Sequence, residues 1–551
     1  MESLDAYYAF TDDSGTIVAG AGIAGDVLKC LAVSEEARSE GLLVPLVSRI
    51  LSEHPAQNLK VFTKPEYQAV FESLGFHLLA RAPLAILLEN GRGLEQYCTY
   101  LRSFAREGRC GVVVMNANPF TLGHKYLLQQ AASQVDHLFV IPVKEDLSHF
   151  PYAERLAMIK AGAPGDVTVL DGSDYVISAA TFPTYFLKDL SDASVTQMYL
   201  DTDLYGRWIA PALGASVRFV GSEPFDALTN HYNRLIPNAV IIPRLDNISA
   251  SSVRSALAAG HYREAAALCP DTTWPYLLAA LVERALRLEL DTPGKPGLVG
   301  PDGPGAHKDM DYNTMLSGIK ALRPFWARMA LAGSAEELRQ LGIDAEAAMT
   351  AATGGVNTHR GAIFCMGLAL YAVSRAFARD VEVPVNEHDM KIFLGEIAQE
   401  LFCIQLKDSN LRITPSARGA RQIALSGYKM LFEDWLPYYR KCSAEGPVGF
   451  SGASAQNIAA EGPVGFSGAS AQKSATEKPT PSAELKLLLR IMSTLDDTCV
   501  VKRVGEERAQ EVKREAKEGK DLYKRYAAEG ISPGGAADML ALTIFIDSII
   551  S

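Results

Sequence analysis

The chain has 551 residues, of which 48% are hydrophobic, and a formal net charge of −11. This length predicts about two to four domains, and the acidic balance argues against nucleic acid as a partner. The eight cysteines form no Cys-x-x-Cys pair, which excludes the usual zinc spacing and favours a cytoplasmic location. We find no signal-peptide pattern and no apolar run of the roughly 18 residues that a membrane helix needs, so no membrane association is expected.

Residues 1–95 predict a small α/β unit. Its expected strands and helices are residues 7–10, 16–23, 27–33, 60–62 and 76–79, and residues 42–51 and 67–74, respectively. This pattern resembles the acyl-CoA N-acyltransferase fold, in which an Arg/Gln-x-x-Gly-x-Gly/Ala turn binds pyrophosphate. The matching turn, residues 38–43, ends in Leu43 instead of a small residue. The resemblance implies a module that holds a pantetheine-like arm or a protein partner, or one that is purely structural.

Residues 105–275 alternate apolar runs with helical segments, which predicts a doubly wound parallel sheet. The expected strands are residues 111–115, 137–143, 167–170, 197–200, 217–220 and 239–242. Ligands of such sheets bind at the carboxyl ends of the strands. The polar segments expected at this edge begin at His124 and include residues 145–146, 201–203, 221–224 and 249–254.

The first of these strands leads through a polar turn into a helix that is expected to begin near His124. A helix N-terminus presents free backbone N–H groups to a phosphate, and Gly123 would let the backbone approach closely. A glycine and a histidine alone fit an ordinary helix start equally well. The turn reads Asn116-Ala117-Asn118-Pro119-Phe120-Thr121-Leu122-Gly123-His124. It resembles the HxGH-type nucleotidyltransferases, with Thr121 in place of the first histidine.

A second motif of that family occurs about one domain later, as Ile248-Ser249-Ala250-Ser251-Ser252-Val253-Arg254. His124 and Arg254 are expected to stabilise charge that develops on the phosphates during adenylyl transfer. The expected nucleotide contacts are Asn116, Asn118, Thr121, Gly123, Lys125, Arg155, Ser249 and Ser251. Lys125 and Arg155 fit a solvated helix face as well as a phosphate clamp.

Three further stretches, residues 150–155, 209–214 and 218–224, resemble the acetate:citrate lyase ligases. The resemblance extends from residue 1 to about residue 280. It implies an enzyme that uses ATP and acetate to acetylate the prosthetic-group thiol of the citrate lyase acyl carrier subunit. Acetyl-adenylate is the implied intermediate, and AMP and pyrophosphate are the implied products.

Residues 276–551 lack strand alternation and predict an all-α domain. The expected helices are residues 276–290, 316–331, 335–341, 361–377, 388–401, 419–432, 483–495, 506–518 and 536–550. Polar motifs lie at five joints between helices, at residues 292–299, 305–311, 355–361, 496–498 and 532–538. In this order they resemble the triphosphoribosyl-dephospho-CoA synthases, which join ATP to dephospho-CoA and release adenine.

Such a glycosyl transfer passes through an oxocarbenium-like transition state and needs a base and cations on the triphosphate. The resemblance implies catalytic roles for Asp309, Asp311 and His359. Substrate contacts are expected from Lys295, His307, Arg360 and Asp538, and Mg²⁺ ligands from Asp496 and Asp497. A carboxylate is the expected base, and the two histidines are expected to be hydrogen-bond donors or acids. Helix capping is the alternative for Asp309, Asp496 and Asp538.

The C-terminal domain departs from that family at Ile423, Cys499 and Lys502, where a glutamate, an asparagine and a histidine are usual. A twelve-residue Gly/Ser/Ala-rich segment also occurs twice, at residues 445–456 and 461–472, which predicts a disordered insertion at about residues 443–482. The two resemblances together predict a bifunctional enzyme of citrate lyase maturation. The alternatives are a ligase with a degenerate C-terminal scaffold, a pantetheine-phosphate-type cofactor adenylyltransferase, and a module that only docks citrate lyase.

Overall fold

In the computed structural model, the described residues are 4–144, 148–176, 192–222, 227–245, 247–378, 387–408, 420–445, 481–519 and 522–550. Residues 145–146 and 223–224, which were expected at the sheet edge, lie outside this set, as does most of the expected insertion at residues 443–482. Within the described part of the chain, no helix is both long enough and apolar enough to span a bilayer. The contacts between residues divide the chain into two units, Met1–Ala250 and Ser251–Ser551.

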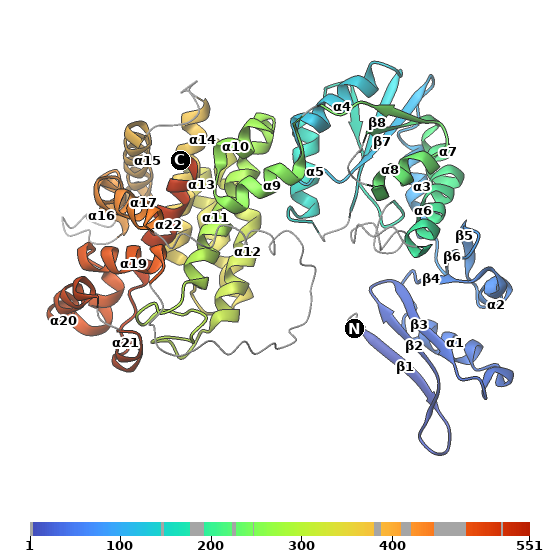
Figure 1. Ribbon diagram of the computed structural model, residues 1–551, viewed down its shortest axis with the longest axis horizontal. Coiled ribbons are helices and arrows are strands. Elements are labelled where there is room, and N and C mark those ends of the chain that lie inside the picture. The colour runs from blue at the N-terminus through green and yellow to red at the C-terminus, as the bar shows by residue number, and fades with distance from the viewer. Residues whose placement is uncertain are drawn as a thin grey trace. The chain divides into compact units, whose positions relative to one another are not determined.

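The first unit begins with a six-stranded sheet of order β1-β2-β3-β4-β6-β5, drawn in blue in Figure 1. Its strands are β1 (Ala6–Thr11), β2 (Ile17–Ala24), β3 (Val27–Val33), β4 (Lys60–Thr63), β5 (His77–Arg81) and β6 (Ile86–Glu89). β3 and β4 pair in parallel, and α1 (Leu43–Glu53) connects them; α2 (Gln68–Ser73) precedes β5. These elements confirm the strands and helices expected for residues 1–95, and β6 is an addition to them.

A second sheet has five parallel strands in the order β11-β10-β7-β8-β9. The strands are β7 (Cys110–Met115), β8 (His137–Pro142), β9 (Val167–Val169), β10 (Ala215–Gly221) and β11 (Ala239–Ile242). The chain starts in the centre at β7, adds β8 and β9 on one side, and returns to add β10 and β11 on the other. The strand order reverses between β7 and β10, and a crevice for a ligand is expected at such a point.

The helices that accompany this sheet are α3 (Gly93–Arg102), α4 (Leu122–Ala132), α5 (Tyr152–Gly162), α6 (Asp192–Leu204), α7 (Ala210–Leu213) and α8 (Ala227–Leu235). The prediction of a strand at residues 197–200 was wrong, because these residues lie inside α6. Met198 and Leu200 are buried and Tyr199 is exposed, and over so short a stretch this pattern is the same as that of a strand. The burial of Ser194, Met198 and Asp201 shows the helical period.

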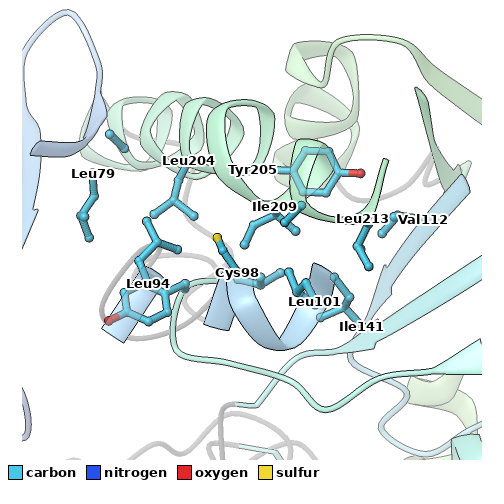
Figure 2. Close-up of a cluster of buried hydrophobic side chains, with 14 of the residues drawn as sticks. Leu79, Leu94, Cys98, Leu101, Val112, Ile141, Leu204, Tyr205, Ile209 and Leu213 are labelled. Carbon is cyan, nitrogen blue, oxygen red and sulfur yellow. The ribbon is translucent and has the colours of Figure 1, made fainter. Parts of the chain in front are cut away.

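One hydrophobic core joins the two sheets of the first unit. Figure 2 shows Leu79 of β5 and Leu94 and Cys98 of α3 in the same cluster as Val112 of β7 and Leu204 of α6. The indole N–H of Trp208 also donates to the carbonyl oxygen of Leu79. Residues 1–95 also have a core of their own, which includes Leu46, Val61 and Phe71, so the shared cluster connects this part to the rest of the first unit.

The second unit is helical, and helices α11, α12, α13, α14 and α22 lie side by side in it (Figure 1). Its first helices are α9 (Ala250–Ala259), α10 (Tyr262–Ala267), α11 (Trp274–Asp291), α12 (Tyr312–Leu331), α13 (Ala335–Ala352), α14 (Arg360–Ala378) and α15 (Glu387–Asp408). They are followed by α16 (Ala420–Leu425), α17 (Leu436–Ala444), α19 (Ala483–Thr494), α20 (Thr498–Glu518), α21 (Tyr523–Glu529) and α22 (Gly534–Ile550).

The helical character expected for residues 276–551 is confirmed for the described residues, with one interruption. The single helix expected over residues 419–432 ends at Leu425, because Gly427 and Tyr428 have φ angles of 64° and 52°. By contacts, the second unit begins at Ser251. Helices α9 and α10 belong to it by contacts, and Arg263 of α10 donates to the carbonyl oxygen of Ile550.

Candidate functional sites

The turn between β7 and α4 fixes the orientation of His124. Thr121 is the N-cap of α4, and its backbone N–H donates to Nδ1 of His124 over 3.0 Å. The Thr121 Oγ1 lies 2.8 Å from the same nitrogen and accepts from the backbone N–H of His124 at 3.4 Å. Because Nδ1 accepts the backbone proton, the neutral ring carries its hydrogen on Nε2. The ring also stacks on Phe120 with a centroid distance of 5.7 Å.

The protonation state of His124 follows from its surroundings. Burial lowers the pKa of His124 to about 4, and the positive charge of Arg244 adds to this effect. The imidazole is therefore neutral near pH 7 and offers Nε2–H as a donor at the N-terminus of α4. That arrangement suits an oxyanion such as a phosphate oxygen.

Within the first unit, the first residue of the second motif lies against this turn. A Cβ placed on Gly123 would lie 3.5 Å from Cγ2 of Ile248 and 3.8 Å from its carbonyl oxygen. Arg244 follows β11 and donates to the carbonyl oxygen of Ile248 over 3.3 Å. Arg244 was not among the residues expected from the sequence, although its place two residues after the carboxyl end of β11 was an available signal.

Ser249 lies in the first unit beside Ile248, whereas Ser251 and Arg254 lie on α9 of the second unit. Burial lowers the pKa of Arg254. Lys125 lies in the first turn of α4, and its backbone N–H donates to the carbonyl oxygen of Thr121. The assignment of Ser249, Ser251, Arg254 and Lys125 to nucleotide binding stays a prediction.

Asn116, Asn118 and Arg155 organise the loop that follows β8. Asn116 Nδ2 donates to Ser148 Oγ at 3.2 Å, and Asn118 Oδ1 accepts from the Phe150 backbone N–H at 3.0 Å. Arg155 is fully buried and donates to the carbonyl oxygens of Asn116, Val143 and Phe150 over 3.0, 2.6 and 3.0 Å. In these contacts all three side chains hold protein backbone or side-chain groups, so the structure favours positioning roles for them.

We expect Arg155→Ala to lower the free energy of unfolding of the first unit by about 3 kcal/mol, because it leaves buried carbonyl oxygens without donors. Urea unfolding would measure this change, and hydrogen exchange at β7 and β8 would assign it to the first unit. Arg102→Ala is the matched control, since Arg102 is exposed on α3. An equal effect of both substitutions would contradict the structural role of Arg155.

The acidic pair expected at residues 201–203 does not lie at the carboxyl end of a strand. Asp201 is buried within α6 and accepts a hydrogen bond from the Tyr232 hydroxyl, which in turn accepts from Arg218 over 2.9 Å. Asp203 accepts from the backbone N–H of Arg81 and pairs with Arg207. Both aspartates therefore connect elements of the first unit.

In the second unit, residues from all five polar joints line one cavity of about 560 Å³. A ligand site for a small molecule is typically about 300–1,000 Å³. The lining residues that carry charge or a titratable group are Glu289, His307, Asp309, His359, Arg360, Asp496, Asp497, Cys499, Lys502, Arg503 and Asp538. Leu286, Leu298, Val299, Met310 and Met315 form an apolar part of the wall. Ile423, Cys499 and Lys502, the three departures noted in the sequence, all line this cavity.

Two residues expected in this site do not line the cavity. Lys295 is 1% exposed and donates to the Glu289 carboxylate over 2.5 Å, so it neutralises a buried acid. Asp311 is exposed and caps α12 by accepting from the Thr314 backbone N–H at 2.8 Å. Glu289 and Arg503 line the cavity but were not among the site residues expected from the sequence. Arg503 directly follows a cavity residue, Lys502, but Glu289 lies inside a helix and gave no signal.

The aspartates of the fourth joint have different surroundings. Asp497 caps α20 through Oδ1, and its Oδ2 accepts from the Ala536 backbone N–H at 2.9 Å. Burial nevertheless raises its pKa. Asp496 has an exposed side chain and pairs with Lys513 over 2.5 Å. Among the described residues, no cluster of three or more His, Cys, Asp or Glu is arranged to hold a metal ion.

The chemistry expected of this cavity depends most on His359 and Asp538. His359 is 4% exposed; its Nδ1 lies 2.8 Å from Thr358 Oγ1, and its buried Nε2 has no hydrogen-bond partner. Burial, together with the charge of Lys295, lowers the pKa of His359 to about 4. Burial and the nearby Asp497 and Glu289 raise the pKa of Asp538 well above its usual value. The cavity thus combines an imidazole whose pKa is lowered with a carboxyl group whose pKa is raised.

Comparisons with known proteins match this chain to two families. The family described as citrate lyase ligase C-terminal domain matches residues 110–277. The family described as ATP:dephospho-CoA triphosphoribosyl transferase matches residues 275–459 and 464–551.

Individual relatives are named for the same two activities. A citrate (pro-3S)-lyase ligase from Escherichia coli (strain K12) is 39% identical over 300 residues, which span 50% of this chain and 85% of that protein. A probable 2-(5''-triphosphoribosyl)-3'-dephosphocoenzyme-A synthase from Azotobacter vinelandii is 30% identical over 295 residues, spanning 49% of this chain and 90% of that protein. A solved bifunctional NMN adenylyltransferase/ADP ribose pyrophosphatase from Francisella tularensis gives a TM-score of 0.20 at 13% identity, over 35% of this chain and 59% of that one.

Proposed function

Since the chain belongs to both the citrate lyase ligases and the ATP:dephospho-CoA triphosphoribosyl transferases, joined in one polypeptide, we propose that it performs two steps of citrate lyase maturation. The second unit makes triphosphoribosyl-dephospho-CoA from ATP and dephospho-CoA. The first unit, with α9 and α10, acetylates the thiol of the finished prosthetic group on the acyl carrier subunit. Both steps act on a pantetheine-bearing group and use ATP, which supports their fusion.

For the ligase, acetate attacks the α-phosphate of ATP, forming acetyl-adenylate and releasing pyrophosphate. The carrier thiol then attacks the acetyl carbonyl, so a thioester forms and AMP leaves. His124 Nε2–H and the N-terminus of α4 donate to the phosphate oxygens, and Arg244 adds positive charge beside them. By family resemblance, Lys125 and Ser249 of the first unit are further candidates for phosphate contacts, and Ser251 and Arg254 are the other residues of the second motif with this expected role.

For the transferase, the cavity is lined by both apolar and cationic side chains, which a site for ATP requires. The apolar wall around Leu298 and Met315 suits a purine, whereas Arg360, Lys502 and Arg503 suit the triphosphate. Mg²⁺ usually reaches such sites bound to substrate phosphates and to one or two carboxylates. Asp309 and Asp496 fit this role, since both line the cavity and have largely exposed side chains. The ion would neutralise charge on the triphosphate.

The observation that carries the proposal is the meeting of five separate joints in one cavity, beside a histidine with an unpartnered buried nitrogen. The test is chromatography of the products of ATP after incubation with Mg²⁺, acetate and dephospho-CoA, whose thiol serves as a surrogate carrier. We expect free adenine that requires dephospho-CoA and AMP that requires acetate.

Each alternative gives a different product pattern. AMP without adenine would indicate a degenerate second unit, for which Ile423, Cys499 and Lys502 are the motivation. Pyrophosphate released with phosphopantetheine, but not with acetate, would indicate a cofactor adenylyltransferase. If neither AMP nor adenine formed with purified acyl carrier subunit also present, only the docking module would remain and the proposal would be overturned.

A further inference from the structure

We propose that Asp538 is the general acid that protonates the departing adenine, and that His359 accepts the proton of the attacking hydroxyl group. This assignment rests on the transferase activity proposed above. It reverses the roles expected from the sequence, where a carboxylate was the base and the histidines were acids or donors.

The first observation is the position of Asp538 on α22. Its side chain lines the cavity and packs against the first turn of α14, where a Cβ on Gly361 would lie 1.8 Å from Oδ2. The carboxyl group accepts a hydrogen bond from the Ala362 backbone N–H, which favours ionisation. No cation among the described residues forms an ion pair with Asp538 that would offset the cost of its burial. A single backbone hydrogen bond offsets only a small part of the free-energy cost of burying an ionised carboxylate.

The second observation is the charge around Asp538. The titratable groups that face it are Glu289 of α11, Asp497 at the start of α20, Cys365 of α14, Cys499 of α20 and Tyr428. None of these groups is a cation. Glu289 already has Lys295 as its partner, and Asp497 accepts several backbone N–H groups. Asp538 has neither a cationic partner like that of Glu289 nor the several backbone donors of Asp497, and this environment favours its protonated form.

The third observation concerns His359. When Nδ1–H donates to Thr358 Oγ1, Nε2 presents a lone pair, and this nitrogen is buried without a partner. Gly318 lets α12 approach this pair, since a Cβ there would lie 2.4 Å from Thr358 Oγ1 and 2.9 Å from His359 Nδ1. The ring is thus held in place. A hydroxyl group that bonds to an oxocarbenium-like carbon becomes strongly acidic, so a base with a pKa of about 4 suffices.

The bond between ribose C1′ and the adenine nitrogen breaks, and its electron pair leaves with adenine, which receives the Asp538 proton. The 2′-oxygen of dephospho-CoA bonds to C1′, and its proton passes to His359. After product release, transfer of that proton through solvent to Asp538 restores both groups. Opposed acid and base roles are the usual consequence of environments that push two pKa values apart.

The test compares two donors of the triphosphoribosyl group. ATP has a leaving group that needs a proton, whereas 4-nitrophenyl ribofuranoside 5′-triphosphate releases 4-nitrophenolate, which needs none. We expect Asp538→Asn to slow adenine release from ATP by about 100- to 10,000-fold and to leave nitrophenolate release nearly unchanged. Asp344→Asn is the control, because Asp344 is exposed on α13 and bonds to Gln340.

The pH dependence of the wild-type rates is a second test, and it does not depend on the folding of a variant. The acid must be protonated, so the rate with ATP should fall as pH rises through the elevated pKa of Asp538. The rate with the nitrophenyl donor should lack this fall. The activity loss on acidification, from protonation of His359, should begin only near pH 4 with either donor.

If Asp538→Asn lowered the rates with both donors equally, or lowered neither rate, the assignment would be overturned. Equal loss would indicate a binding or metal-holding role, since both donors carry the same triphosphate. A pH profile that is identical for both donors would also overturn it. Failure of the transferase proposal itself looks different, because the wild-type protein would then release no adenine with dephospho-CoA.

Discussion

The His124→Ala variant is expected to lose acetate-dependent AMP formation by about 100-fold or more, while adenine release by the second unit stays unchanged. The substitution removes the Nε2–H donor that Thr121 orients through Nδ1. It also removes a ring that stacks on Phe120, so some loss of stability in the first unit is expected. AMP and adenine would be measured in the same incubation, which makes the second unit an internal standard.

His137→Ala is the matched control for this prediction. His137 starts β8, at the amino end of the same parallel sheet, and so lies away from the edge where ligands bind. We expect wild-type AMP formation from this variant. Unchanged AMP formation in His124→Ala would contradict the assignment of the turn between β7 and α4 as the adenylylation site.

The second large effect is expected from Gly361→Ala, which should reduce adenine release by at least about 100-fold and leave AMP formation intact. The added Cβ would lie 1.8 Å from Oδ2 and 2.8 Å from Cγ of Asp538. The carboxyl group is the end of a side chain and moves more easily than the backbone of α14. We therefore expect a folded protein whose Asp538 is displaced from its place in the cavity.

Gly342→Ala is the control for the added methyl group. Gly342 lies inside α13, and a Cβ there meets nothing within 4 Å. Alanine at this helical position should raise stability by up to about 1 kcal/mol without changing either activity. Thermal unfolding and adenine release would be measured for both variants. Full adenine release from Gly361→Ala would show that the placement of Asp538 is not needed.

Most elements could be predicted from the sequence, because hydrophobic periodicity reports which face of a segment is buried. The strands β7, β8, β10 and β11 and the long helices α11, α12, α14 and α22 were found in this way. The error at residues 197–200 arose because four residues are too few to separate a strand period from a helix period. Helix α16 ended early because Gly427 and Tyr428 adopt positive φ angles, which the apolar pattern does not reveal.

By itself, the sequence determined the two families, the order of the two units and the segments that carry chemistry, since motif residues and their spacing are properties of the chain. Only the tertiary structure decided what individual side chains do. Arg155 and Thr121 both belong to motif-bearing segments, yet their polar atoms are used by backbone and ring partners that fold against them. The roles of His359 and Asp538 depend on burial and on charges contributed by α11 and α20. Protonation is set by the surroundings in three dimensions, which no local pattern of residues encodes.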